Sequence, residues 1–118
     1  MHTILIVDDH AGFRTQARAL LEADGFAVVG EAHDGASGLA AARSLHPDLV
    51  LLDIGLPDIE GFDVATALAA DTKPPTVVLT SSRQAVAYRR RLAASPALGF
   101  ITKDELTGAA LRALAASP

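Results

Sequence analysis

The sequence predicts an α/β domain in which helices cover both faces of a doubly wound, five-stranded parallel sheet. Five short runs of β-branched and other apolar residues alternate with longer, alanine-rich stretches whose apolar positions recur at helical spacing. Three of the short runs are apolar throughout, as expected of parallel strands buried on both faces. Turn-forming pairs such as Asp24-Gly25 and Pro47-Asp48 separate the runs. This alternation predicts five strand–helix units joined by right-handed crossovers.

Each strand is predicted from a short run in which Val, Ile, Leu and Thr dominate and a polar or turn-forming residue follows. The predicted strands are, in chain order, Thr3–Val7, Ala27–Gly30, Leu49–Leu52, Thr76–Leu79 and Gly99–Thr102. Each helix is predicted from an amphipathic stretch between two such runs. The predicted helices are Ala11–Ala23, Ala36–Ser44, Phe62–Ala70, Ala85–Ala94 and Glu105–Ala116.

Length and composition restrict the kind of protein. The 118 residues suffice for one domain, residues 1–118, with a hydrophobic core. A net charge of −4 does not favour direct contact with nucleic acid, and zero cysteines exclude disulfides, thiolate metal sites and a cysteine nucleophile. No apolar run approaches the roughly 20 residues that cross a bilayer, and no signal peptide is evident. We therefore expect a cytoplasmic protein without membrane contact.

Polar residues follow four of the five predicted strands. Asp8 and Asp9 follow the first strand, Asp53 the third, Thr80 the fourth and Lys103 the fifth. Ligands of open α/β sheets bind beyond the carboxyl ends of the strands. If the four strands are contiguous, these side chains converge on one rim.

The chemistry that suits this set is phosphoryl transfer. Three crowded carboxylates repel one another, and a hard divalent cation such as Mg²⁺ relieves the repulsion. Asp53 is the natural nucleophile, because it stands at the centre of the rim and a carboxylate can form an aspartyl-phosphate. Asp8 and Asp9 would then hold the metal. Lys103 would supply a positive charge for phosphoryl oxygens, and the Thr80 hydroxyl would donate a hydrogen bond.

Each of these residues also has an ordinary structural explanation. Asp9 could cap the first helix, and Asp53 could be a turn residue. Thr80 alone is a residue that favours strands, and Lys103 alone is a solvated charge. The functional interpretation rests on four separate strand ends that carry one mutually consistent chemistry.

The chain resembles the receiver domain of two-component response regulators from Ile4 to about Ala116. The resemblance is carried by the stretches ILIVDDH, PDLVLLDIGLPDIEGFD, VVLTSS and GFITKD. It implies the flavodoxin-like strand order 2-1-3-4-5. It also implies that a sensor histidine kinase donates a phosphoryl group to Asp53. Such domains assist only their own phosphorylation and dephosphorylation, so no other enzyme activity is expected.

The resemblance assigns further roles to single residues. The backbone carbonyl of Gly55 would complete the Mg²⁺ ligands provided by Asp8, Asp9 and Asp53. Phosphorylation would draw Thr80 inward, and Phe100 on the fifth strand would follow it. The surface formed by the fourth helix, fifth strand and fifth helix would change. Because Phe100 lacks a hydroxyl, this switch would rest on packing.

The sequence departs from the family pattern after the lysine, where proline is usual and Asp104 stands here. A cis peptide is therefore not expected, because a non-proline cis bond costs about 3 kcal/mol. Lys103-Asp104, Asp8–His10 and Phe13-Arg14 resemble the subgroup fused to helix-turn-helix DNA-binding outputs. The 118 residues contain no such output, so we expect a separate output protein or an output domain absent from this chain. A homodimer is also compatible with this interpretation.

Two other features have competing explanations. The run Arg89-Arg90-Arg91 is either a solvated helix face or a partner surface. His10 either flanks the acidic pair or takes part as a metal ligand or phosphoryl relay, although an oxygen-ligand site gains little from imidazole.

Three rival functions are weaker. A haloacid dehalogenase-type phosphatase would carry Asp-x-Asp after its first strand, whereas Asp8 and Asp9 are adjacent here. A receiver that acts only as a constitutive dock would not need every key position. A flavodoxin-like cofactor binder would not need three acids on one rim.

Overall fold

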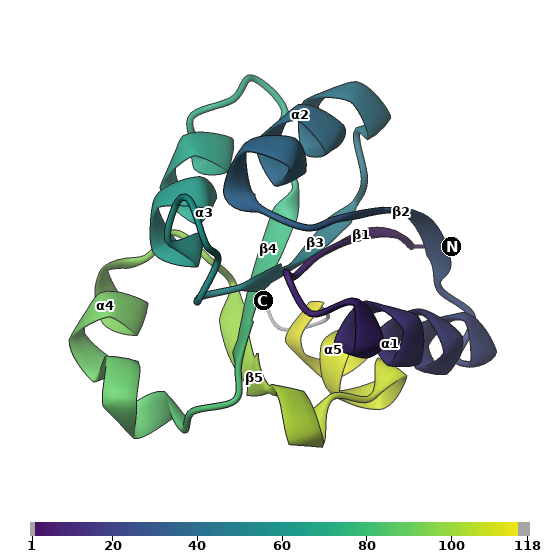
Figure 1. Ribbon diagram of the computed structural model, residues 1–118. Coiled ribbons are helices and arrows are strands. Elements are labelled where there is room, and N and C mark those ends of the chain that lie inside the picture. Colours follow the sequence, from purple (N-terminus) through teal and green to yellow (C-terminus); the bar gives the residue numbers. More distant parts are fainter. Residues whose placement is uncertain (1, 116–118) are drawn as a thin grey trace.

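The computed structural model describes residues 2–115 (Figure 1). Five parallel strands form one sheet in the order β2-β1-β3-β4-β5, so the expected fold class and strand order are confirmed. The strands are β1 (Thr3–Val7), β2 (Ala27–Ala32), β3 (Leu49–Asp53), β4 (Thr76–Ser81) and β5 (Gly99–Thr102).

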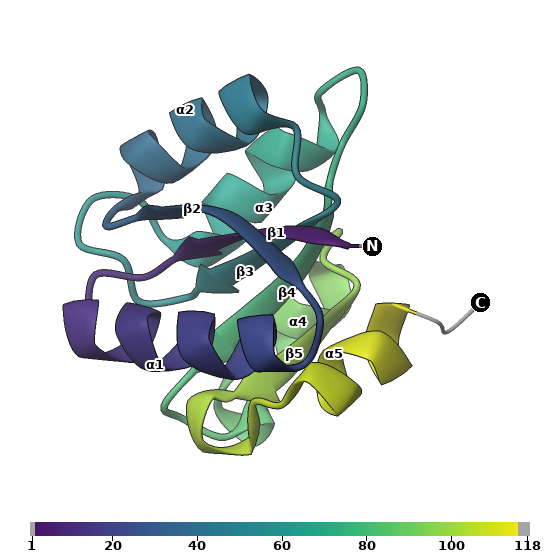
Figure 2. The ribbon, with the colours of Figure 1, turned by 90° about the vertical axis from the view of Figure 1, so that its right-hand side faces the viewer.

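Five α-helices lie on the two faces of the sheet (Figure 2). They are α1 (Ala11–Ala23), α2 (Gly35–Leu45), α3 (Gly61–Ala69), α4 (Arg89–Ala94) and α5 (Gly108–Ala115). Helices α1 and α5 cover one face, and α2, α3 and α4 cover the other. Among the described residues, no helix has the length and apolar composition required to cross a membrane.

Alternation along β1 explains how one strand serves two cores. Ile4 and Ile6 point toward α1 and α5, whereas Leu5 and Val7 point toward α2 and α3. All four side chains are fully buried. A strand buried on both faces must be apolar at each position, which is why the TILIV run shows no polar alternation.

Three strands extend beyond their predicted ends. Glu31 and Ala32 pair with β1, Asp53 pairs with Thr80, and Ser81 pairs with β5. These residues are polar or small, so the apolar pattern ends before the hydrogen-bonded ladder does. The extension places Asp53 and Thr80 in the sheet itself, in register with each other.

The fourth helix differs from the prediction of one helix over Ala85–Ala94. Ala85–Tyr88 form a 3₁₀ turn, and α4 begins only at Arg89. The turn carries the Tyr88 hydroxyl to within 3.0 Å of Ser81 Oγ on β4. This contact between distant parts of the chain cannot be read from helical spacing.

The fifth helix begins three residues later than predicted. Lys103–Glu105 form a 3₁₀ turn, and α5 starts at Gly108. The Thr107 hydroxyl accepts a hydrogen bond from Ala110 N, as a residue at a helix N-terminus does. The predicted last residue, Ala116, lies outside the described residues.

Candidate functional site

Three strand ends bring charged side chains together at the carboxyl edge of the sheet. Asp8 follows β1, Asp53 ends β3 and Lys103 follows β5. Lys103 Nζ lies 2.8 Å from Asp8 Oδ2 and 3.5 Å from Asp53 Oδ2. The ammonium therefore bridges two carboxylates that are 45 residues apart in the sequence.

Asp53 is a carboxylate in an unfavourable environment. It is 4% exposed and its side chain lies next to that of Asp8. Burial, followed by the charge of Asp8, raises the pKa of Asp53, although Lys103 and the Gly55 N–H partly oppose this. The group therefore gains from any additional positive charge brought to the rim.

The acidic pair lies beside Asp53. Ligand atoms of Asp8, Asp9, His10 and Asp53 all lie within 4.8 Å of one another. His10 Nδ1 is 3.2 Å from one carboxylate oxygen of each member of the pair. Such a cluster of oxygen atoms, with an imidazole at its edge, is able to hold a cation.

Thr80 contributes a buried hydroxyl to the same edge. Its Oγ1 atom has no hydrogen-bond partner among the described residues, although Thr80 is only 1% exposed. Buried polar atoms are normally paired, and an unpaired one costs roughly 1–3 kcal/mol. Because Thr80 is in register with Asp53, this free donor lies on the strand beside the central carboxylate.

The loop after β3 is tightly fixed. A side chain at Gly61 would collide with the backbone carbonyl of Asp53, and Gly61 N donates to Ile54 O over 2.9 Å. Asp58 accepts hydrogen bonds from Gly35 N and Ala36 N at the start of α2. The loop is therefore held by two helices while its exposed Gly55 remains open to solvent.

Of the ordinary structural roles considered for single residues, one is absent and one is present. Asp9 does not cap α1, because the N-cap residue is His10. Asp53 does accept a turn-like hydrogen bond from Gly55 N at 3.3 Å, so its structural and chemical interpretations coexist. All peptide bonds within residues 2–115 are trans, including the one between Lys103 and Asp104, as expected.

Phe100 lies at the other end of the predicted switch. Its ring packs against that of Tyr88, with the centres 6.1 Å apart. Tyr88 also contacts Phe62 and is hydrogen-bonded to Ser81. Sequence reasoning missed Tyr88, because the only sign of its role was an isolated aromatic residue before an arginine run.

Two residues of the first helical turn also reach the site. Arg14 Nη1 donates to the Asp8 carbonyl oxygen, and the Lys103 ammonium lies over the Phe13 ring. The sequence pointed to Phe13-Arg14 only as a subgroup resemblance. The helical register of α1, which turns both side chains toward the strand ends, supplies the missing information.

The three arginines of the run Arg89-Arg90-Arg91 differ in their surroundings. Arg91 pairs with Glu60, and its guanidinium lies 4.3 Å from the centre of the Phe62 ring. Arg91 therefore ties α4 to α3. Arg89 and Arg90 are exposed, and for them both the solvated helix face and the partner surface stay predictions.

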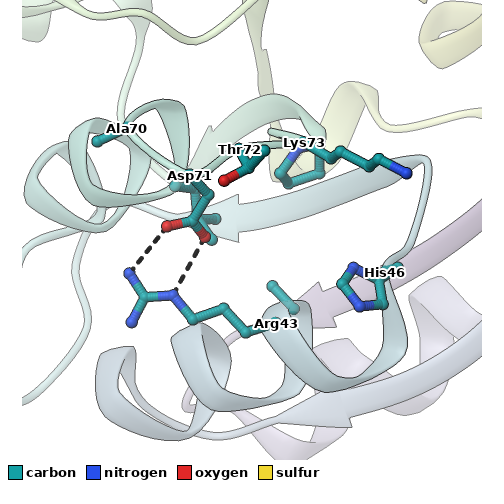
Figure 3. A pocket seen from close by; sticks show the side chains of 9 residues that line it. Arg43, His46, Ala70, Asp71, Thr72 and Lys73 are labelled. Atoms are coloured by element: carbon teal, nitrogen blue, oxygen red, sulfur yellow. Dashed lines mark hydrogen bonds and ion pairs between the residues drawn. The ribbon is translucent and has the colours of Figure 1, made fainter.

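A separate cavity of about 580 Å³ lies at the opposite edge of the sheet, between the ends of α2 and α3 (Figure 3). Arg43 and Asp71, which line the cavity, form an ion pair with two hydrogen bonds. His46 and Lys73 also line the cavity. None of the strand-end residues predicted to be functional lines this cavity. It is distinct from the acidic rim.

Comparison with known protein families shows to which family the chain belongs. Residues 4–115 match the response regulator receiver domain. The chain belongs to this family. Receiver domains are signalling domains of two-component systems and are generally not enzymes.

Relatives of this receiver domain include longer regulators. BvgA of Bordetella pertussis is 39% identical over 102 residues, which are 86% of this chain and 49% of BvgA. The DNA-binding response regulator MtrA of Mycobacterium tuberculosis is 45% identical over 85 residues, 70% of this chain and 36% of MtrA. The chain thus spans half or less of the length of these relatives. They agree with the expected resemblance to regulators that bind DNA.

Solved structures agree with the fold of this receiver domain. The signal receiver domain of the response regulator NarL from Mycobacterium tuberculosis has a TM-score of 0.88 and 32% sequence identity. The similarity covers 98% of both chains.

Proposed function

We propose that this receiver domain accepts a phosphoryl group on Asp53 from the phosphohistidine of a sensor histidine kinase. The observation that carries the proposal is the buried Thr80 hydroxyl, which has no hydrogen-bond partner among the described residues and is in register with Asp53. Lys103 Nζ lies 3.5 Å from the carboxylate of the same Asp53. A phosphoryl group on Asp53 would give the hydroxyl an acceptor. It would also give Lys103 further oxygens to bind.

The residues present fit Mg²⁺. The carboxylate donors are oxygen atoms, which hard cations prefer. Asp8 Oδ2 is buried and lies 2.8 Å from the Lys103 ammonium. Asp8, Asp9 and Asp53 would hold the ion, and the family pattern adds the Gly55 carbonyl. When bound, Mg²⁺ supplies positive charge that offsets the carboxylates and the incoming phosphoryl oxygens.

The transfer itself is a displacement at phosphorus. An Asp53 carboxylate oxygen forms the new bond to phosphorus, and the phosphorus–nitrogen bond of phosphohistidine breaks. The electron pair of that bond returns to the imidazole, which leaves. Lys103 and Thr80 bind phosphoryl oxygens and hold the group in place.

The proposed output is a change of the α4-β5-α5 surface. Phosphorylation draws Thr80 toward the phosphoryl group, and Phe100 repacks in response. Tyr88 lies between the moving parts, since it contacts Phe100 and is hydrogen-bonded to the neighbour of Thr80. Repacking of Phe100 therefore acts on the 3₁₀ turn that leads into α4.

The proposed partners follow from the relatives. We expect a sensor histidine kinase upstream and either a separate output protein or a DNA-binding domain downstream. The receiver domain itself would not contact nucleic acid, and a homodimer is one form in which the surface could act. Placement in the cytoplasm and the assignment of residues 1–118 to the receiver alone stay predictions.

Intact-mass measurement after incubation with acetyl phosphate and Mg²⁺ tests the proposal. Wild-type protein is expected to gain one phosphoryl group, and Asp53→Asn is expected to gain none. Asp63→Asn, which removes an exposed carboxylate on α3, is the matched control and should be modified like wild type. Absence of modification in wild type, or its persistence in Asp53→Asn, contradicts the proposal.

A further inference from the structure

The first turn of α1 contacts both halves of the candidate site from one side. Arg14 Nη1 donates a 2.7 Å hydrogen bond to the backbone carbonyl oxygen of Asp8. Lys103 Nζ lies 4.8 Å from the centre of the Phe13 ring. Of two consecutive residues of one helix, Arg14 therefore contacts the acidic pair and Phe13 contacts the lysine.

Arg14 is itself fixed by a chain of charged groups. Its Nε atom donates to Glu31 Oε1 at 3.2 Å, and Glu31 Oε2 accepts a 2.7 Å bond from Arg18. The Arg14 side chain is only 18% exposed. A planar guanidinium that donates to two acceptors has little freedom to turn.

This arrangement determines how the acidic pair is presented. The carbonyl held by Arg14 belongs to the peptide that joins Asp8 to Asp9, and Asp8 N donates to Ala32 O at the other side. The Asp9 carboxylate is 32% exposed and contacts the exposed ring of His10. The position of Asp9 is therefore set mainly by the contacts of the neighbouring backbone, and less by the contact of its own side chain with His10.

Phe13 acts on the other half of the site. A cation within about 6 Å of an aromatic ring is attracted to its face. The ring provides no hydrogen-bond acceptor, so it holds the Lys103 ammonium without using any of its N–H donors. Those donors remain for oxygen atoms of the site, of which Asp8 Oδ2 is at 2.8 Å.

We propose that Phe13 and Arg14 are positioning residues of the phosphoacceptor site. Arg14 sets the geometry of the metal-binding pair through the Asp8 carbonyl, and Phe13 holds the lysine that binds phosphoryl oxygens. The inference rests on the proposed function and assigns separate tasks to neighbouring residues. Arg14 governs metal binding, and Phe13 governs the reaction once metal is bound.

Arg14→Gln tests the first task. Isothermal titration of the unphosphorylated protein is expected to show Mg²⁺ affinity reduced about tenfold, because groups that orient metal ligands commonly contribute that much. The Mg²⁺ concentration that half-saturates modification by acetyl phosphate should rise, while the rate at saturating Mg²⁺ stays unchanged. Arg43→Gln breaks an ion pair at the opposite edge and is the matched control (Figure 3). Equal affinity of Arg14→Gln and wild type overturns this assignment.

Phe13→Leu tests the second task. The half-saturating Mg²⁺ concentration should stay unchanged, and the rate at saturating Mg²⁺ should fall about threefold, in line with a modest cation–π interaction. Phe26→Leu removes a similar ring under Arg112, away from the site, and should keep the wild-type rate. A wild-type rate in Phe13→Leu, or equal losses in both variants, overturns the assignment. Thermal melts establish that each variant is folded.

The wild-type measurement distinguishes failure of the proposed function from failure of the positioning roles. If acetyl phosphate does not modify wild type, the proposed function fails, and the Phe13 assignment fails with it. The Mg²⁺ titrations of wild type and Arg14→Gln still decide the Arg14 assignment in that case. If wild type is modified and neither variant differs from it, the proposed function stands and the positioning roles are wrong.

Discussion

Asp53 and Thr80 are buried polar residues whose charge and hydroxyl, respectively, are not fully balanced by the groups around them. Asp53 carries a charge beside Asp8 that Lys103 only partly offsets, and Thr80 holds a hydroxyl without a partner among the described residues. Both features cost stability. Both would be relieved by a phosphoryl group and a cation, so each makes a measurable prediction about folding.

Asp53→Asn should raise the melting temperature in Mg²⁺-free buffer at neutral pH by a few degrees. Since the folded-state pKa of Asp53 lies above its ordinary value of 3.8, ionisation of this group destabilises the folded protein. The advantage of the variant is full above the raised pKa, shrinks as pH falls through it, and is absent below the ordinary value of about 3.8. Calorimetry across this range measures it, and a pH-independent difference would contradict the assignment.

Thr80→Val should increase the free energy of unfolding by about 1 kcal/mol, because it removes an unpaired hydroxyl and keeps the shape. Thr102→Val is the matched control. Thr102 is also buried, but its hydroxyl donates to Glu105 at 2.9 Å, so the same substitution should destabilise. Denaturant titration measures both values. A loss of stability in Thr80→Val, as in Thr102→Val, would show that the Thr80 hydroxyl is paired.

The local sequence pattern predicted the first and last residues of a helix or strand well where the segment itself determines them. The bounds of β1, β5 and α1 agree with the prediction, since apolar spacing and turn residues define them. The start of α5 was missed, because Asp24 Oδ2 accepts the Gly108 N–H from 84 residues away. No local pattern reveals such a contact. A distant partner, together with the cap provided by Thr107, therefore sets the start of α5.

Gly61→Ala tests how closely α3 is packed against the end of β3. The added Cβ atom would overlap the Asp53 carbonyl, so we expect a loss of several kcal/mol in stability, or a protein that does not fold. Gly12→Ala is the matched helical control, because no described atom outside its chain neighbours and its own helix backbone lies within 4 Å of the new Cβ. It should gain up to about 1 kcal/mol from helix propensity. Denaturant titration distinguishes the two, and a neutral Gly61→Ala would refute the close approach.

For the whole molecule, the candidate site could be predicted because a parallel sheet places all carboxyl strand ends on one edge. Asp8, Asp53 and Lys103 do meet there, in contact distances that no spacing rule provides. The strand order that makes them neighbours came from the family resemblance. The contributions of Arg14 on α1 and of Tyr88 in the 3₁₀ turn before α4 depended on the packed fold and could not be predicted.

Mg²⁺ should stabilise the whole domain by linkage. A ligand that binds only the folded state adds about 2.7 kcal/mol at 100 times its dissociation constant. Asp8→Asn should lose most of the rise in melting temperature that Mg²⁺ gives wild type. Asp71→Asn, which alters an acid at the opposite edge, should keep it. An equal rise in all three proteins would indicate non-specific binding.

The placement of Tyr88 has a practical consequence. It is the single tyrosine of a chain without tryptophan, and it lies between Phe62 and Phe100 with its hydroxyl on Ser81. At excitation wavelengths that phenylalanine does not absorb, the fluorescence of the unlabelled protein therefore originates at one place, where α3, β4 and β5 meet the turn before α4. Movement of that turn changes the surroundings of this single tyrosine, so the protein carries its own optical probe of the surface through which it would signal.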